Sequence, residues 1–169
     1  MEAYEAIVTR RSIRKYTSEP VSDDVVKQLM DAAMAAPSAG NEQPWQFVVI
    51  RDRAVLDALP TVHPNFRHAQ AAPMAVLVCG DLEKEAHQAF WVQDCTAATQ
   101  NVLLAAHALG LGAVWMGIYP REERLPGLRK LLGLPEHVVP LALLAVGHPA
   151  ESKPRAERYD ASRVHYDRW

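Results

Sequence analysis

An unbroken apolar segment, MAVLVC at residues 74–79, constrains the fold of this chain more than any other feature. It follows Pro73 and shows no alternation of apolar and polar side chains, so it predicts a strand that is covered on both faces. Three further segments predict strands, at residues 45–50, 113–118 and 138–146. The chain therefore needs elements packed on both sides of a sheet.

Helical patterns separate the predicted strands. They cover residues 2–9, 22–36, 53–59, 83–109 and 121–132, the last interrupted near Pro126. In the first, Tyr4, Ile7 and Val8 are candidates for an apolar side; in the second, Ser22 is a suitable N-cap. Helices and strands in alternation indicate an α/β or α+β domain with a mixed sheet.

Bulk properties exclude several classes of protein. A length of 169 residues fits one domain, 1–169. The net charge of -2 offers no overall attraction to nucleic acid or to an anionic membrane. Two isolated cysteines form no disulfide framework, the N-terminus does not resemble a signal peptide, and no segment reaches the roughly 20 apolar residues of a membrane span. We therefore expect a cytoplasmic protein without membrane or nucleic-acid partners.

The segment RRSIRKY at residues 10–16 concentrates positive charge. If it is extended, Arg10, Ser12 and Arg14 point to one side. Guanidinium groups bind phosphate oxygens through charge-assisted hydrogen bonds, and a serine hydroxyl adds a neutral donor. By composition alone, a solvated basic patch or a nucleic-acid contact remains an alternative.

Two loop regions could accept a flat ligand. The segment PSAGNEQPW at 37–45 carries Asn41 and Gln43, whose amides can pair with the edge of a heteroaromatic ring, although the segment taken alone favours an ordinary helix-to-strand turn. In GLGAVWMGIYP at 110–120, a predicted strand runs into Gly117, where a backbone N–H could meet a ligand. The glycine spacing does not match a dinucleotide-binding fingerprint.

Other chemistry lacks its usual signature. The histidines are scattered without an HExxH or paired CxxC motif, so no metal site is expected. Neither a GxSxG elbow nor a P-loop is present. The segment after Gly147 is polar, yet it ends with Val164, Tyr166 and Trp169, and such anchors should pack on another surface, for which a second subunit is a candidate.

Taken in order, five segments resemble the nitroreductase family of FMN enzymes, above all its small, compact branch. They are RRSIRKY, APSAGNEQPWQFVVI, AAPMAVLVCG, DCTAATQNVLLAAHALGLGAVWMGIYP and LLAVGHPAESKP. The resemblance implies an α+β fold with a central mixed sheet flanked by helices, assembled as an intertwined homodimer. The helix near residues 90–109 would lie at the dimer core, the tail would embrace the partner, and two FMN molecules would lie at the subunit interface.

The resemblance also assigns roles to the matching residues of this chain. Arg10 and Ser12 would bind the FMN phosphate, and Arg11 would contribute backbone or ribityl contacts. A basic residue after the last strand would complete the phosphate site, with Lys153 and Arg158 favoured over Arg155.

At the flavin ring, Arg14 would lie near the N1–C2=O edge, and the Gly117 N–H would point at N5. A loop of the partner subunit, with Pro37, Ser38 and Ala39, would line the flavin. The amides of Asn41 and Gln43 would support that loop, and Trp115 and Met116 would face the ring.

The implied activity is reduction of nitroaromatics, quinones or similar small acceptors by NADH or NADPH, in ping-pong fashion through flavin N5. The cofactor carries the chemistry, so no side chain is nominated as a catalytic acid or base. Alternatives within the fold are reductive dehalogenation, enoate reduction, flavin fragmentation or a non-catalytic flavin-binding dimer. The short connection between Gln70 and Trp91 leaves little room for a substrate-specific lid, which favours the general reductase.

Overall fold

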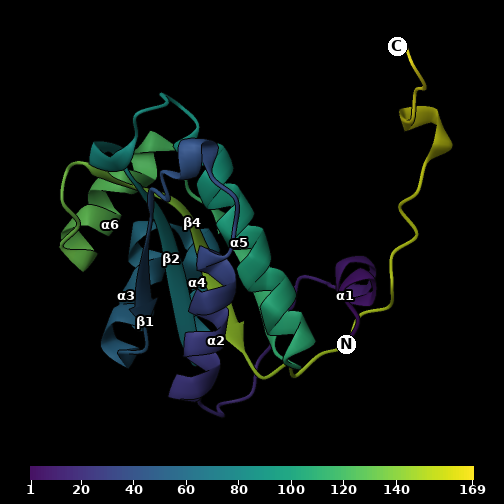
Figure 1. The fold of residues 1–169 in the computed structure, drawn as a ribbon. Coiled ribbons are helices and arrows are strands. Elements are labelled where there is room, and N and C mark those ends of the chain that lie inside the picture. Colours follow the sequence, from purple (N-terminus) through teal and green to yellow (C-terminus); the bar gives the residue numbers. More distant parts are fainter.

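A four-stranded antiparallel sheet forms the centre of the computed structural model, which describes residues 1–169 (Figure 1). Its strands are β1 (Trp45–Ile50), β2 (Met74–Asp81), β3 (Gly112–Gly117) and β4 (Val138–Gly147), in the spatial order β1-β2-β4-β3. Every residue of β2 is buried, which confirms the strand predicted from the unbroken apolar segment.

Topology explains why neighbouring strands are all antiparallel. β2 and β3 run in the same direction and are joined through a long helix, but β4 lies between them and is antiparallel to both. Parallel pairing is limited to one isolated bridge between Ser12 and Ala113. The predicted α+β class is confirmed, but the sheet is antiparallel throughout its four strands rather than mixed, because the parallel bridge lies outside them.

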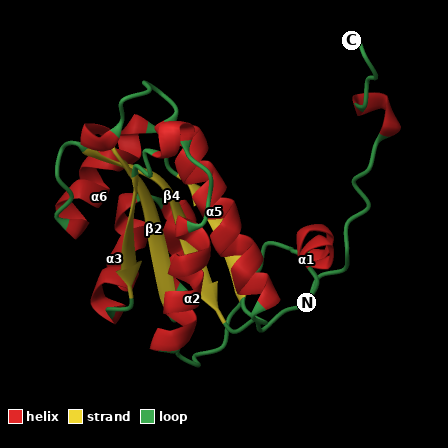
Figure 2. Ribbon diagram, viewed as in Figure 1, coloured by secondary structure: helices red, strands yellow, loops and turns green.

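Helices cover both faces of the sheet (Figures 1 and 2). They are α1 (Ala3–Thr9), α2 (Asp23–Met34), α3 (Arg53–Val62), α4 (Arg67–Gln70), α5 (Trp91–Ala108) and α6 (Leu125–Leu132). α2 and α5 pack on one face, and α3, α4 and α6 pack on the other. No helix has the length and apolar character required to span a membrane.

The sheet separates two apolar clusters. Met74, Val76 and Val78 of β2 belong to the cluster beneath α2 and α5. Leu77 and Cys79 belong to the cluster beneath α3, α4 and α6. Side chains alternate between two buried faces, so the segment from residue 74 to residue 79 has no polar position, and the buried Asp81 lies only at the end of the strand.

Leu144 of β4 provides a test of the packing. It is fully buried in the cluster beneath α2 and α5. Leu144→Ala should lower the free energy of unfolding by about 2–5 kcal/mol, because it removes apolar contacts and leaves a cavity. Urea denaturation measures the change, with Leu82→Ala, at a side chain that is 39% exposed, as the control. Equal losses in the two variants would contradict this account of the core.

Two predicted helices differ from the structure. The helix expected over 83–109 begins only at Trp91, after the 3₁₀ turn η3 (Leu82–Lys84) and a non-helical stretch that includes Ala89 with φ 71°. The stretch is held instead by long-range contacts, including a hydrogen bond from the His87 N–H to the Glu42 carboxylate at 2.9 Å. The helix expected over 121–132 is a 3₁₀ turn, η4 (Glu122–Arg124), followed by α6 with Pro126 in its first turn.

Both ends of the chain leave apolar side chains uncovered. On α1 only Ala6 is buried, while Tyr4 and Ile7, expected on its packed side, are 73% and 56% exposed. After β4 the chain runs away from the body to a lone 3₁₀ turn, η5 (Ala161–Arg163) (Figure 1). Tyr166 and Trp169 are 81% and 101% exposed. The predicted anchors therefore find no partner surface in their own chain.

Candidate functional site

The basic segment lies beside the first residues of β3, where Ser12 and Ala113 form an isolated parallel bridge. The Ile13 N–H donates to the Ala113 carbonyl at 3.0 Å. Gly112 permits this close approach, because a Cβ there would lie 2.6 Å from Ile13 Cγ2. A glycine of the 110–120 segment thus serves chain packing, and the packing fixes where the arginines lie.

Four arginines converge near α1 and the start of the tail. The cavity between these elements, of about 260 Å³, is lined by Arg10, Arg11, Arg155 and Arg158, and also by Glu157, which lies 3.7 Å from Arg155. Burial, followed by the charges of Arg158 and Arg11, lowers the pKa of Arg10. The Arg10 Nε is shielded from water and has no hydrogen-bond partner. A cluster of like charges with an unpaired buried donor is suited to an anion.

Lys153 has a different position from Arg158. Its Nζ donates to the Ser12 carbonyl at 2.6 Å and lies 3.3 Å from the Glu151 carboxylate. Glu151 in turn accepts a hydrogen bond from the Arg14 N–H at 2.6 Å, and this bond is the main reason that the pKa of Glu151 is lowered. Lys153 and Glu151 therefore hold the backbone of the basic segment, whereas Arg155 and Arg158 line the cavity with Arg10.

The ring-facing residues predicted from two distant segments meet at a second cavity. About 270 Å³ in volume, it is lined by Arg14, Asn65, His68, Val114, Trp115, Met116, Gly117 and Arg124. No sequence pattern marked Asn65, His68 or Arg124. They lie in short turns and helices whose local sequence resembles any polar connection, so only the tertiary fold identifies them.

The backbone at Gly117 faces away from the sheet. Ile118 donates to the Leu141 carbonyl of β4 at 2.9 Å, whereas the Gly117 carbonyl accepts from the Arg124 side chain on the opposite edge. Because the N–H and C=O of one residue in an antiparallel strand point to the same side, the Gly117 N–H lies on the open edge of β3. The space beside its Cα is also free, since a Cβ there would meet nothing closer than 4.0 Å.

His68 is a titratable group of this second cavity. Burial lowers its pKa, and the charges of Arg14 and Arg67 lower it further. The pKa of His107, which lies near Arg10, is lowered for the same kinds of reason. Both imidazoles therefore resist protonation in the folded chain.

These lowered pKa values predict how stability changes with pH. The unfolded chain binds protons at His68 and His107 near pH 6.5 more readily than the folded chain does, so the free energy of unfolding should fall as the pH drops below about 6.5. Urea denaturation between pH 7.5 and 5.5 measures this slope. His68→Gln should reduce it, while the same change at exposed His165 should not. A steeper slope in His68→Gln would contradict the assignment.

The loop at residues 37–43 is strongly bent and largely self-supported. Gly40, Asn41 and Gln43 have φ values of 55°, 58° and 51°. The Gln43 N–H donates to Ser38 Oγ at 3.0 Å, and the Gln43 amide donates to the Asn41 amide oxygen at 3.0 Å. The two amides therefore bind each other within this chain.

The loop and the arginine cluster lie at opposite ends of α5. Ala39 donates to Asp94 Oδ1 at 3.0 Å near the start of the helix, whereas Thr9 Oγ1 lies 2.8 Å from His107 Nε2 near its end. At 1.5 Å per residue, Asp94 and His107 are separated by about 20 Å along the axis. One chain thus brings Arg10–Arg14, residues 115–117 and the start of the tail together, but not Pro37, Ser38 and Ala39.

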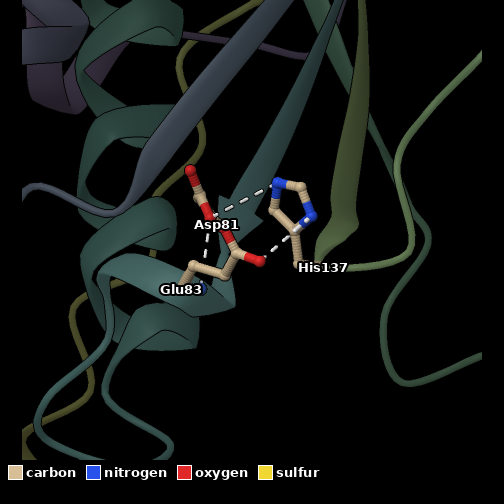
Figure 3. A group of neighbouring side chains, drawn as sticks. All are labelled: Asp81, Glu83 and His137. Atoms are coloured by element: carbon tan, nitrogen blue, oxygen red, sulfur yellow. Dashed lines mark hydrogen bonds and ion pairs between the residues drawn. The ribbon is translucent and has the colours of Figure 1, made fainter.

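A separate polar group lies where β2 ends and β4 begins (Figure 3). His137 lies between two carboxylates, 4.0 Å from Asp81 and 3.7 Å from Glu83. Their ligand atoms lie within 4.8 Å of one another, but both Asp81 oxygens already accept hydrogen bonds, from the Glu83 N–H and the Gln46 amide. Hydrogen bonds to Asp81 and the proximity of the His137 ring to both carboxylates account for this group without a bound ion. The sequence could not reveal it, because Asp81 and His137 are distant in the chain.

Comparison with known proteins places this chain in one family. The model of the nitroreductase family matches residues 7–72 and 60–148. A provisionally assigned NADH dehydrogenase/NAD(P)H nitroreductase of Methanothermobacter thermautotrophicus is 48% identical over 169 residues, covering 100% of this chain and 88% of the relative. The chain belongs to the nitroreductase family.

Solved structures agree with this assignment. A crystal structure of a protein of the same provisional assignment from Parabacteroides distasonis has a TM-score of 0.94 and 39% identity, covering 99% of this chain and 98% of the other. A provisionally assigned nitroreductase of Desulfovibrio desulfuricans, solved in complex with FMN, has a TM-score of 0.86 and 36% identity, covering 100% of this chain and 98% of the other.

Proposed function

We propose that this protein is a homodimeric oxidoreductase that binds FMN and uses NADH or NADPH to reduce nitroaromatics, quinones or similar small acceptors. One observation carries the proposal: the buried, unpartnered Nε of Arg10, which lies at a cavity shared with Arg11 and Arg158. The FMN bound by the relative from Desulfovibrio desulfuricans and the NAD(P)H nitroreductase assignment of the archaeal relative support it.

The arginine cluster fits the phosphate of FMN. Each of its guanidinium groups repels the others, and a doubly charged phosphate would remove that repulsion and provide acceptors for Arg10. Arg11 already donates to the Pro154 carbonyl at 3.0 Å, so it also ties the start of the tail to the site. Ser12 would add a hydroxyl, while Lys153 fixes its carbonyl.

The second cavity fits the isoalloxazine ring. When bound, FMN accepts a hydride from NAD(P)H at N5 and delivers electrons to the acceptor. Gly117 would donate its free N–H toward N5, and the absence of a side chain leaves space for a flat ring. Arg14 would stabilise negative charge at the N1–C2=O edge through preorganised electrostatics, so these residues position and stabilise rather than transfer protons.

A second copy of the chain would complete the site. Because the loop carrying Pro37, Ser38 and Ala39 lies about 20 Å along α5 from the arginine cluster, we assign its contact with the flavin to a partner subunit. An apolar groove of about 380 Å³ between α1, α2 and α5 provides a surface for that partner. Its lining is Met1, Ala3, Ala6, Ile7, Ala32, Ala35, Asn101, Leu104, Ala105 and Ala108. The exposed aromatic side chains of the tail provide a second surface for the partner.

The decisive experiment follows the flavin spectrum. The purified protein should be yellow or take up added FMN, and anaerobic NADH or NADPH should bleach it. A colourless protein that takes up no FMN would overturn the proposal. Yellow protein that does not bleach would instead support a non-catalytic flavin-binding dimer.

Arg14→Ala tests the proposed electrostatic role. Loss of a charge interaction of about 1–2 kcal/mol should lower the two-electron potential of the flavin by roughly 20–40 mV and slow its reduction. Potentiometry against a reference dye measures the shift, and Arg14→Lys, which keeps the charge, should retain most of the wild-type potential. An unchanged potential in Arg14→Ala would refute the role.

A further inference from the structure

The cavity at the open end of β3 is unusually poor in negative charge. Its polar lining comprises Arg14, Asn65, His68 and Arg124, and no carboxylate lines it. Arg14 is already assigned to the flavin under the proposed function. The cavity therefore contains a cation, Arg124, that the proposed chemistry does not use.

Arg124 is fixed beside the backbone of Gly117. It ends the turn η4, which directly follows β3, and its Nη1 donates to the Gly117 carbonyl. Its side chain is only 15% exposed, and its Nε is shielded from water without a hydrogen-bond partner. Glu123 is the nearest acid, but its carboxylate lies 4.0 Å away and is 64% exposed, so it compensates the charge weakly.

A largely buried guanidinium without a bonded anion is costly, and it attracts an anionic ligand. Residue 117 carries the N–H proposed to face flavin N5, so a ligand held by Arg124 would lie next to the position of hydride exchange. We infer that Arg124 selects acceptors that carry a carboxylate, binding the carboxylate oxygens in the cavity at the end of β3. The inference rests on the proposed function and specifies its substrate class.

A matched pair of acceptors tests this preference in the FMN-loaded protein. 4-Nitrobenzoate and 4-nitrobenzamide share the reducible nitro group and differ mainly in charge. Wild-type protein should have a higher kcat/KM for the benzoate. Arg124→Gln keeps a donor for the Gly117 carbonyl but removes the charge, so kcat/KM for 4-nitrobenzoate should fall by about 10-fold to 100-fold, mainly through KM, while the value for the amide changes less than about 3-fold.

Binding without turnover gives an independent measurement. Benzoate added to the oxidised, FMN-loaded protein should perturb the flavin absorption spectrum, and its Kd should rise about 10-fold or more in Arg124→Gln. Arg124→Lys should recover part of the affinity. Arg121→Ala, at an exposed cation of the same turn that does not line the cavity, is the matched control and should leave the Kd unchanged.

The results separate the inference from the proposed function. Protein that takes up no FMN would refute the proposed function itself. Protein that is bleached by NADH but binds benzoate and benzamide equally would overturn only the role of Arg124. A raised KM for NADH in Arg124→Gln, without any change for 4-nitrobenzoate, would assign the cation to the pyrophosphate of the donor and would also overturn the inference.

Discussion

Removal of residues 159–169 is expected to convert the proposed dimer to monomers and to abolish FMN binding, although only Tyr159 among the aromatic residues removed contacts the rest of its own chain, where it lines the arginine cavity. Tyr159, Tyr166 and Trp169 are 83%, 81% and 101% exposed. Burial of each large aromatic side chain on a partner contributes roughly 1.5–3 kcal/mol. Their joint loss should raise the dissociation constant of the dimer by about 10³-fold or more.

Sedimentation velocity and flavin content measure both consequences of this truncation. The substitution Arg163→Ala, at an exposed tail residue whose partner Asp160 lies in the same turn, is the control and should leave the dimer intact. A truncated protein that retains its mass in solution and its FMN would refute the proposed role of the tail. In a monomeric protein, deletion of such exposed residues would leave stability nearly unchanged.

Arg10→Ala should weaken FMN binding by about 10-fold to 150-fold, the range for a lost hydrogen bond between charged groups. The same substitution should raise the stability of the flavin-free protein or leave it unchanged. Arg10 has an unpaired buried Nε and is repelled by Arg11 and Arg158, so its removal relieves an unfavourable interaction. A site formed for an anion is expected to show this opposition between ligand affinity and stability.

Titration of FMN into the flavin-free protein, followed by quenching of flavin fluorescence, gives the affinity, and thermal unfolding gives the stability. Lys15→Ala removes an exposed cation of the same segment that lines none of the described cavities, and it should change neither quantity appreciably. Wild-type affinity in Arg10→Ala, together with a lower melting temperature, would show that Arg10 has a structural role and no part in phosphate binding.

Local sequence determined most of the elements of this protein. β1 has the predicted bounds, Trp45–Ile50, and β2 follows from a short apolar segment after Pro73, which is typical of a strand covered on both faces. Ser22 accepts from the Val25 N–H at the start of α2, as an N-cap should. These features depend on neighbouring residues and on periodicity, which a sequence displays directly.

Only the tertiary structure decided which of these elements meet. In the folded chain β4 lies between β2 and β3, and α5 begins only after a stretch in which His87 contacts Glu42. His68 and Arg124 lie at the cavity beside Gly117. It also placed the loop at 37–43 at the opposite end of α5 from the arginine cluster. These results arise from packing between segments distant in the chain, and such contacts leave no periodic pattern in either segment alone.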